Sequence, residues 1–237
     1  MLKGSFLSRS LHKWIGLFIG MQVLIWLATG LYMVVINLDF IHGDTLVRNM
    51  QRAIEIPPSS RISMAGLRAR YPDASAISLQ AVMNRTYLVV TTPAGRHLVN
   101  PESGDVESPL DHETARDIAL FHFNGDAAIR VISLITADPP REIGPRRLPL
   151  WRVDFNDRFN TSFYIDPYTG TLVTRRHRYW RIFDFFFMLH IMDYDERTDV
   201  HNPLLKVAQL TGVVFVITGI WLLFYSFTKR RKVAVKE

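Results

Sequence analysis

The side chains best suited to chemistry lie between residues 175 and 199, where three blocks of different character follow one another. Four arginines fall within residues 175–181, the apolar block 182–192 carries Asp184 as its one charge, and an acidic block follows. Its carboxylates are Asp193, Asp195, Glu196 and Asp199. Such a cluster suits hard cations, but it lacks the turn glycine and the bidentate glutamate of a calcium loop. We therefore interpret the acidic block as a solvated surface.

Asp166 is a second candidate, because it ends a strand-like run in the phrase Tyr164-Ile165-Asp166-Pro167-Tyr168-Thr169-Gly170. The same phrase occurs earlier as Leu98-Val99-Asn100-Pro101-Glu102-Ser103-Gly104. An Asx-Pro pair starts a turn, its side-chain oxygen bonds the following backbone, and glycine supplies the positive φ that reverses the chain. This favours a structural role for Asp166 over a catalytic one. The offset of 66 residues predicts two copies of one small module.

The chain contains no cysteine, which excludes thiol catalysis, disulfides and cysteine-ligated zinc or iron–sulfur centres. No nucleophile elbow, metalloprotease helix, phosphate loop or dinucleotide fingerprint occurs in it. The residues therefore leave open whether the protein is an enzyme.

Two long uncharged runs predict membrane anchors. Residues 14–38 and 207–228 contain no charged side chain, and each run is long enough to cross a bilayer. We predict transmembrane helices at 14–38 and 203–228. The first run is too long for the apolar region of a signal peptide and has no small-x-small cleavage site after it, so an uncleaved anchor is favoured over a cleaved secreted protein.

Charge predicts the orientation. The leader 1–13 and the tail 229–237 together carry +7 and the whole chain +6, so the remainder carries −1. The positive-inside rule puts both termini in the cytoplasm and the central domain in the periplasm of a bacterial inner membrane. The sequence pI of about 9.7 therefore reflects topology, and no nucleic-acid partner is expected.

The central region reads as a linker (39–58), a first module (59–107), a second module (108–176) and an interfacial segment (177–202). In the first module we expect a helix at 62–71 capped by Ser59 or Ser60, then strands 76–83 and 87–92 around an Asn84-Arg85 turn. The second module repeats this, with Asp111 as N-cap and strands at 128–136, 148–155 and 161–165. In the strand expected at 148–155, apolar and polar residues alternate, which predicts one buried and one solvated face.

These features resemble PepSY-associated transmembrane proteins. The resemblance rests on the two repeated turns, the opening Leu11-His12-Lys13-Trp14-Ile15-Gly16-Leu17 and the late Leu189-His190. It implies an α+β fold: two tandem PepSY-like modules, each a helix packed on an antiparallel sheet, between two transmembrane helices. It also implies a relationship to inner-membrane iron–siderophore reductases.

In those reductases, histidines on membrane helices are implicated in holding haem, so the resemblance nominates His12 and His190 as ligands of haem b. The two residues lie at opposite ends of a span, roughly 30 Å apart, and cannot bind one iron. A haem on the periplasmic side could use His42, His190 and His201, with Arg178 or Arg181 pairing the propionates. Alternatively, His42 and His201 are solvated junction residues.

A haem at His12 would need a ligand from another copy or another protein. Small residues on the spans predict close helix contact, either within one chain or in a homodimer; they are Gly16, Gly20, Gly212 and Gly219.

Three functional hypotheses follow. The first is a haem-binding electron-transfer or iron–siderophore uptake component, acting if it is an enzyme as a ferric-siderophore reductase. The second is a non-catalytic periplasmic module that holds a peptidase or receptor partner by adding a strand to its sheet. The third is a small structural subunit of a membrane complex.

Overall fold

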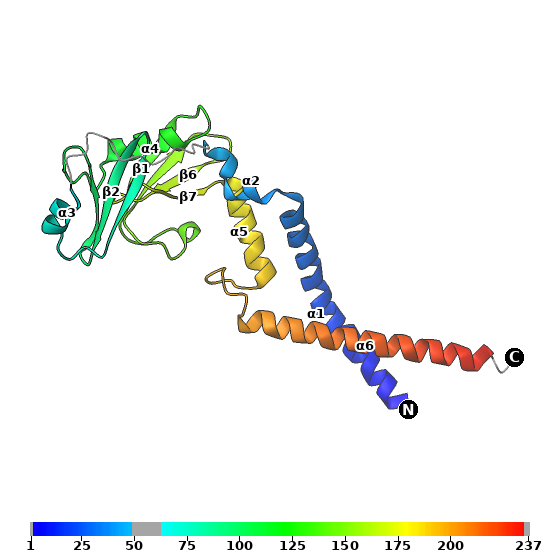
Figure 1. Cartoon of the computed structure of the whole chain (residues 1–237). Coiled ribbons are helices and arrows are strands. Elements are labelled where there is room, and N and C mark those ends of the chain that lie inside the picture. The colour runs from blue at the N-terminus through cyan, green and yellow to red at the C-terminus, as the bar shows by residue number, and fades with distance from the viewer. Residues whose placement is uncertain (1, 49–62, 235–237) are drawn as a thin grey trace. The chain divides into compact units, whose positions relative to one another are not determined.

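The computed structural model describes residues 2–48 and 63–234 and divides the chain into two compact units. The helical unit comprises residues 1–37 and 182–237, and the sheet unit comprises residues 38–181. The sheet unit contains two antiparallel sheets with helices (Figure 1), which confirms the predicted α+β class.

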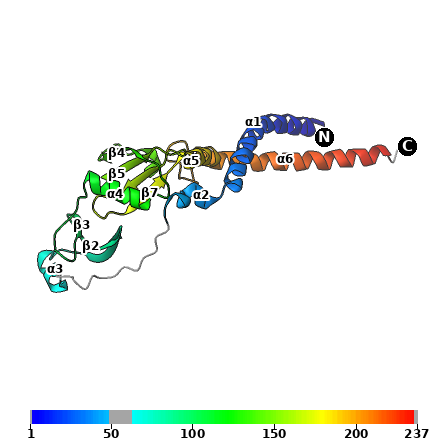
Figure 2. The same cartoon turned by 90° about the horizontal axis from the view of Figure 1, so that it is seen from above.

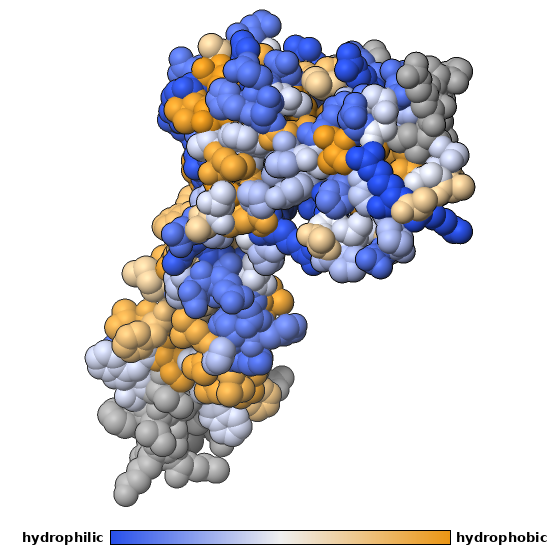
Figure 3. Space-filling model, turned by 90° about the vertical axis from the view of Figure 1, so that its left-hand side faces the viewer, coloured by the Kyte–Doolittle hydropathy of each residue, from blue (hydrophilic) through white to orange (hydrophobic). Residues whose placement is uncertain are grey.

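The helical unit is built on two long helices, α1 (Leu2–Val35) and α6 (Pro203–Ala234). The stretches His12–Val35 and Pro203–Phe224 are long and apolar enough to cross a membrane. Large hydrophobic side chains remain exposed along both helices. Figure 3 shows hydrophobic surface, coloured orange, on one face of the molecule. Because so much apolar surface is unfavourable in water, these helices are suited to a lipid environment. Helix α1 ends at Val35, and the boundary of the first span at residue 38 stays a prediction.

A shorter helix, α5 (Arg178–Ile191), precedes α6 in the chain, and its residues from Ile182 onward belong to the helical unit. There it packs on α1, where the rings of Tyr32 and Phe186 meet edge to face at 5.0 Å. The segment predicted to lie at the membrane interface is therefore helical over its first part.

The first sheet has the order β1-β2-β3, with strands Ala76–Val82, Arg85–Thr92 and Gly95–Val99. Val82 pairs with Arg85, so the hairpin turn is Met83-Asn84 and not Asn84-Arg85 as predicted. Helix α3 (Met64–Arg70) precedes the sheet, and its N-cap is Ser63, whose Oγ accepts a hydrogen bond from Gly66 N at 3.0 Å. The predicted caps Ser59 and Ser60 lie outside the described residues.

The second sheet has the order β4-β5-β6-β7, with strands Ile129–Ile135, Leu150–Phe155, Ser162–Ile165 and Leu172–Arg176. Helix α4 (His112–His122) precedes it, and the predicted cap is confirmed, because Asp111 Oδ1 accepts a hydrogen bond from Thr114 N at 2.8 Å. Backbone hydrogen bonding at this cap lowers the pKa of Asp111. A short 3₁₀ helix, η2 (Arg141–Ile143), lies between β4 and β5.

One core joins the two modules. Alternate residues of β2 point to opposite faces, so Tyr87 and Val89 join the core of the second module, while Val90 packs with Leu67 of α3. Each helix therefore packs on its own sheet, as predicted, and Figure 2 shows α3 beside the first sheet and α4 beside the second. The shared core also contains buried residues of α4 and the second sheet, namely Ile118, Ala119, Val153, Phe155, Phe163 and Ile165. The module boundaries 59–107 and 108–176 stay a prediction.

The first part of the predicted linker folds onto the second module instead. It forms the short helix α2 (Leu38–His42) and the 3₁₀ helix η1 (Asp44–Leu46). Ile41 is 1% exposed, and the Leu46 carbonyl accepts a hydrogen bond from Asn124 N at 2.8 Å. The apolar residues within this polar stretch supply the burial that holds it there. Residues 49–58 lie outside the described part of the chain.

Candidate functional sites

His190 lies at the end of α5 against α1. Its Nδ1 is 2.9 Å from Thr29 Oγ1, and its backbone carbonyl accepts a hydrogen bond from Trp26 Nε1 at 2.8 Å. Gly30 lies beside the ring, where an added Cβ would be 3.7 Å from His190 Cε1. Contacts with Trp26, Thr29 and Gly30 of α1 therefore fix the orientation of the imidazole near the C-terminal end of the first span.

His12 occupies a similar setting near the other end of α1. Its Nδ1 is 2.9 Å from Thr218 Oγ1 of α6, and its ring stacks on Phe215 with centroids 4.3 Å apart. A Cβ on Gly219 would lie 3.0 Å from His12 Cε1, and one on Gly16 would lie 2.9 Å from the Phe215 ring. Glycine at both positions therefore allows α1 and α6 to cross closely.

The hydrogen bonds of the Thr29 and Thr218 hydroxyls determine the tautomer of both histidines. Thr29 Oγ1 donates its hydrogen to the Ile25 carbonyl at 2.8 Å, and Thr218 Oγ1 donates to the Phe215 carbonyl at 2.8 Å. Because each hydroxyl has only one hydrogen, it can only accept from the histidine beside it. Nδ1 of each neutral imidazole therefore carries the proton, and Nε2 carries a lone pair. Among the described residues, no hydrogen bond to either Nε2 is found.

The two histidines do not meet. His12 and Thr29 are seventeen positions apart on α1, which is about 26 Å at the α-helical rise. This agrees with the expectation that one iron cannot use both.

The other nominated residues are placed differently. His42 and His201 are exposed, the former in the sheet unit and the latter in the helical unit. Arg178 is also exposed. Arg181 is held inside the sheet unit: its Nε donates to Glu142 Oε2 at 2.6 Å, and its Nη1 donates to the Asn160 carbonyl at 2.7 Å. Its guanidinium is therefore engaged by the protein.

Sequence reasoning missed the partner of Arg181. Burial raises the pKa of Glu142, but hydrogen bonds from Arg181 and from the Tyr164 hydroxyl outweigh it, so the pKa of Glu142 lies below its usual value. The same burial and the nearby carboxylate raise the pKa of Tyr164. Glu142 stands in an irregular segment without periodicity, and nothing in its surroundings in the sequence indicates that it is paired.

A second missed residue is His177, which appears in the sequence as one member of a basic run. It is fully buried, and its Nε2 donates to the carbonyls of Phe40 and Ile41 at 2.9 and 3.0 Å. Its Nδ1 is buried without a hydrogen-bond partner among the described residues. Desolvation lowers the pKa of His177. The residue fastens the chain after the first span to the second module.

The acidic block is solvated as predicted at Asp195, Glu196 and Asp199, which are exposed, but not at Asp193. Asp193 is only 8% exposed, and its carboxylate accepts four backbone hydrogen bonds from residues 195–199. These hydrogen bonds lower the pKa of Asp193. Asp184 pairs with Arg197. Asp193 thus organises the loop before α6. No cluster of three or more histidine and acidic side chains suited to a metal ion occurs in the described residues.

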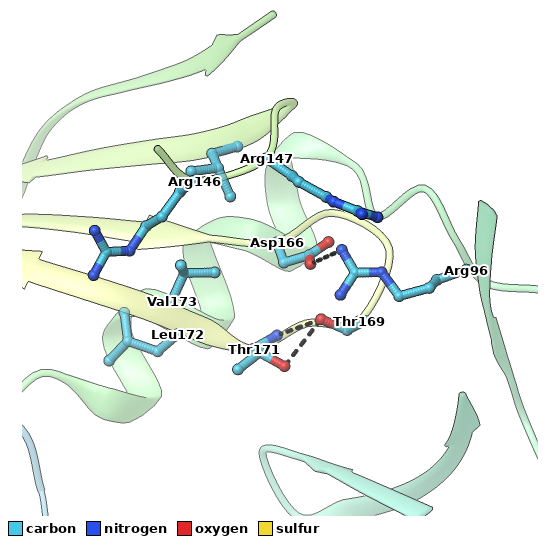
Figure 4. Close-up of a pocket in the computed structure, with 9 residues that line it drawn as sticks. Arg96, Arg146, Arg147, Asp166, Thr169, Thr171, Leu172 and Val173 are labelled. Atoms are coloured by element: carbon cyan, nitrogen blue, oxygen red, sulfur yellow. Dashed lines mark hydrogen bonds and ion pairs between the residues drawn. The ribbon is translucent and has the colours of Figure 1, made fainter. Parts of the chain in front are cut away.

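The repeated turns have the structure that the sequence predicts. Asp166 Oδ1 accepts from Tyr168 N at 2.8 Å, and Asn100 Oδ1 accepts from Glu102 N at 2.9 Å. The glycines four residues on, Gly104 and Gly170, have φ of +85° and +67°. Asp166 has a further partner, since its Oδ2 accepts from Arg96 Nη2 at 2.6 Å (Figure 4).

Comparison with known proteins agrees with this arrangement. The family model for the PepSY-associated TM region matches residues 9–236, nearly the whole chain. No curated protein and no solved structure matches the chain. With two helices suited to spanning a membrane on either side of two helix-and-sheet modules, the chain is a membrane protein and belongs to the PepSY-associated transmembrane family.

Proposed function

We propose that this protein is an electron-transfer component of the bacterial inner membrane that binds haem b through His12 and His190 and serves the uptake of iron–siderophore complexes. The observation that carries the proposal is the pair of hydrogen bonds from these histidines to Thr218 and Thr29, each at 2.9 Å. Both leave an Nε2 lone pair on an imidazole within apolar helices.

This arrangement fits an iron ligand. Histidines that bind a metal almost always donate their other ring N–H to a protein acceptor, which fixes the tautomer and the orientation of the ring. Polar residues within membrane-spanning segments are costly and are functional candidates by default. When bound, haem would supply reversible one-electron transfer, while the threonines orient the ligands and the surrounding helices exclude water.

Two copies of the chain would supply the ligand pairs. One chain offers one threonine-held histidine at each end of α1, so two axial histidines for each haem require a second copy. The four glycines of the spans differ in whether they contact the other long helix of the same chain. Gly16 and Gly219 serve the crossing within the chain, whereas an added Cβ at Gly20 or Gly212 would meet no described atom within 4 Å. The faces around Gly20 and Gly212 are therefore available for a second copy.

The contact between His12 and Thr218 also supports the orientation. It brings the start of the first span beside the end of the second, as expected for antiparallel helices with both termini on one side. The basic residues of the two tails support a cytoplasmic location for that side and a periplasmic location for the sheet unit.

Absorption spectroscopy tests the proposal on the full chain, purified in detergent from cells supplied with haem. We expect a Soret band that shifts on reduction with dithionite and one haem per chain. His12→Ala and His190→Ala should each halve the haem content, because each removes one of the two sites in a dimer. His42→Ala and His201→Ala are matched controls and should leave the haem content unchanged.

A colourless protein from haem-replete cells would overturn the proposal, as would an equal loss of haem in the two control variants. A colourless protein would favour the second hypothesis, in which a peptidase or receptor partner adds a strand to a sheet of this protein. The strands β1 and β4 lie at sheet edges and could accept such a strand.

A further inference from the structure

A cavity of about 470 Å³ lies in the sheet unit, whereas the two threonine-held histidines belong to the helical unit. It is lined by Arg96 of β3, by Arg146 and Arg147 before β5, and by residues of β5, β7 and the Asp166 turn. Small-molecule sites typically enclose roughly 300–1,000 Å³. The cavity therefore has the size of a ligand site.

The charges in this cavity do not balance. Asp166 neutralises Arg96 through the ion pair at 2.6 Å. Arg146 donates to the Ile143 carbonyl, which holds its side chain but brings no opposing charge. Arg147 is exposed, and no hydrogen bond or ion pair of its side chain is found among the described residues. Three arginines and one aspartate leave a charge of +2, which favours a dianion.

Apolar side chains form the rest of the wall. Leu150, Leu172 and Val173 line the cavity, and Leu150 is almost fully buried. Inorganic phosphate would pair with the arginines but leave this apolar surface uncovered. A ligand with an aliphatic portion would cover it and gain from its burial.

Figure 4 shows how the cations are distributed around this surface. The side chains of Arg146 and Arg147 extend in opposite directions, with Val173 between them, and Arg147 extends toward the Asp166 end. Carboxylates suit arginine because two parallel N–H···O bonds can form between the planar groups. We infer that the cavity binds an aliphatic dicarboxylate, with one carboxylate at Arg146, the other at Arg147, and the chain over Leu172 and Val173.

This site stands apart from the proposed haem function, because none of its residues belongs to the helical unit. The two ideas can therefore fail separately. A His190→Ala protein, in which the haem proposal predicts a lost site, should bind the dicarboxylate with unchanged affinity.

Titration calorimetry of the full chain in an uncharged detergent tests the inference, with suberate, octanoate and inorganic phosphate as probes. We expect suberate to bind more tightly than either other anion. Losing one charge-assisted contact should weaken binding by about 10- to 100-fold, so Arg146→Gln and Arg147→Gln should lower suberate affinity by that factor. Arg68→Gln on α3 removes an exposed arginine of the same unit outside the cavity and should have no effect.

Thermal unfolding of each variant shows that it is folded. The absence of suberate binding to the folded wild-type protein would overturn the inference. So would phosphate binding as tight as suberate binding, since the apolar wall would then contribute nothing. A loss in Arg68→Gln equal to that in Arg147→Gln would also overturn it, because it would indicate a general charge effect.

Discussion

Arg96 Nη2 donates to Asp166 Oδ2 at 2.6 Å, and this ion pair joins the β2–β3 hairpin of the first module to the turn that ends β6 in the second. The equivalent turn in the first module has Asn100, which has the same backbone role but no charge. The single difference between the two Asx residues thus creates a contact between the copies. It also sets the charge at one end of the arginine-lined cavity.

Asp166→Asn should separate these two roles. An asparagine can still accept from Tyr168 N, as Asn100 does from Glu102 N, but it cannot pair with Arg96. The free energy of unfolding should fall by about 1 kcal/mol, since Asp166 is buried and Arg96 is partly exposed. Asp166→Ala, which also removes the turn bond, should cost about 2 kcal/mol. Urea unfolding of the full chain in detergent measures both, and equal losses would contradict separate roles.

His177 should make stability depend on pH. Desolvation lowers its pKa in the folded protein from the ordinary value of 6.5, and it outweighs the hydrogen bonds to the Ile41 and Phe40 carbonyls, which raise the pKa. Arg181 and Asp157 have smaller effects that oppose each other. Between the two pKa values the unfolded chain binds more protons, so the free energy of unfolding should fall as pH decreases below about 6.5. Above about pH 6.5, His177 is neutral in both the folded and the unfolded chain, so its full contribution to the free energy of unfolding is present.

Thermal unfolding between pH 7.5 and 5 measures this effect. His177→Gln keeps an N–H donor for the carbonyls of Phe40 and Ile41 but does not titrate, so the dependence on pH should become weaker. His122 is half-buried, and desolvation lowers its pKa too, so His122→Gln should remove a further part of the dependence on pH. An unchanged dependence in His177→Gln would contradict this assignment.

Local signals in the sequence predicted the elements of the fold well. The repeated turns, the Asp111 cap and the apolar runs of the spans depend on neighbouring residues, and the structure agrees with each. Burial of polar residues was harder to predict. The alternation of apolar and polar residues in β5 predicts that Asp154 is solvated, yet this residue is only 7% exposed. Its carboxylate accepts a hydrogen bond at 2.6 Å from Ser162 Oγ of the next strand, which allows it to be buried.

The candidate sites show the same limit. The resemblance nominated His12 and His190, but their partners Thr218 and Thr29 are 206 and 161 positions away and became visible only in the structure. Likewise, the cavity arginines come from two separate parts of the chain, since Arg96 lies in β3 and the adjoining Arg146 and Arg147 precede β5. Spacing along the chain carries no signal for such groups.

The glycines of the spans should differ in their effects. A side chain at Gly16 would collide with Phe215, so Gly16→Ile should disturb the crossing of α1 and α6 and lower the unfolding temperature. Gly20 has open space around it among the described residues, so Gly20→Ile should leave that temperature unchanged. If two copies pair through the face around Gly20, Gly20→Ile should reduce fluorescence energy transfer between differently labelled copies in liposomes. Unchanged transfer in Gly20→Ile would exclude Gly20 from the pairing surface.

The tautomer assigned to His190 can be measured without haem. In full chain produced without haem and labelled with ¹⁵N at histidine, Nδ1 of His190 should show the chemical shift of a protonated nitrogen and Nε2 that of an unprotonated one. Thr29→Val keeps the shape of the side chain but removes the hydroxyl that holds Nδ1–H in the described part of the chain, so the two tautomers should then mix. Thr211→Val on α6 is the matched control, because its hydroxyl bonds only the Val207 carbonyl among the described residues. A protonated Nε2 in the wild-type protein would contradict the assignment and remove the lone pair on which iron binding depends.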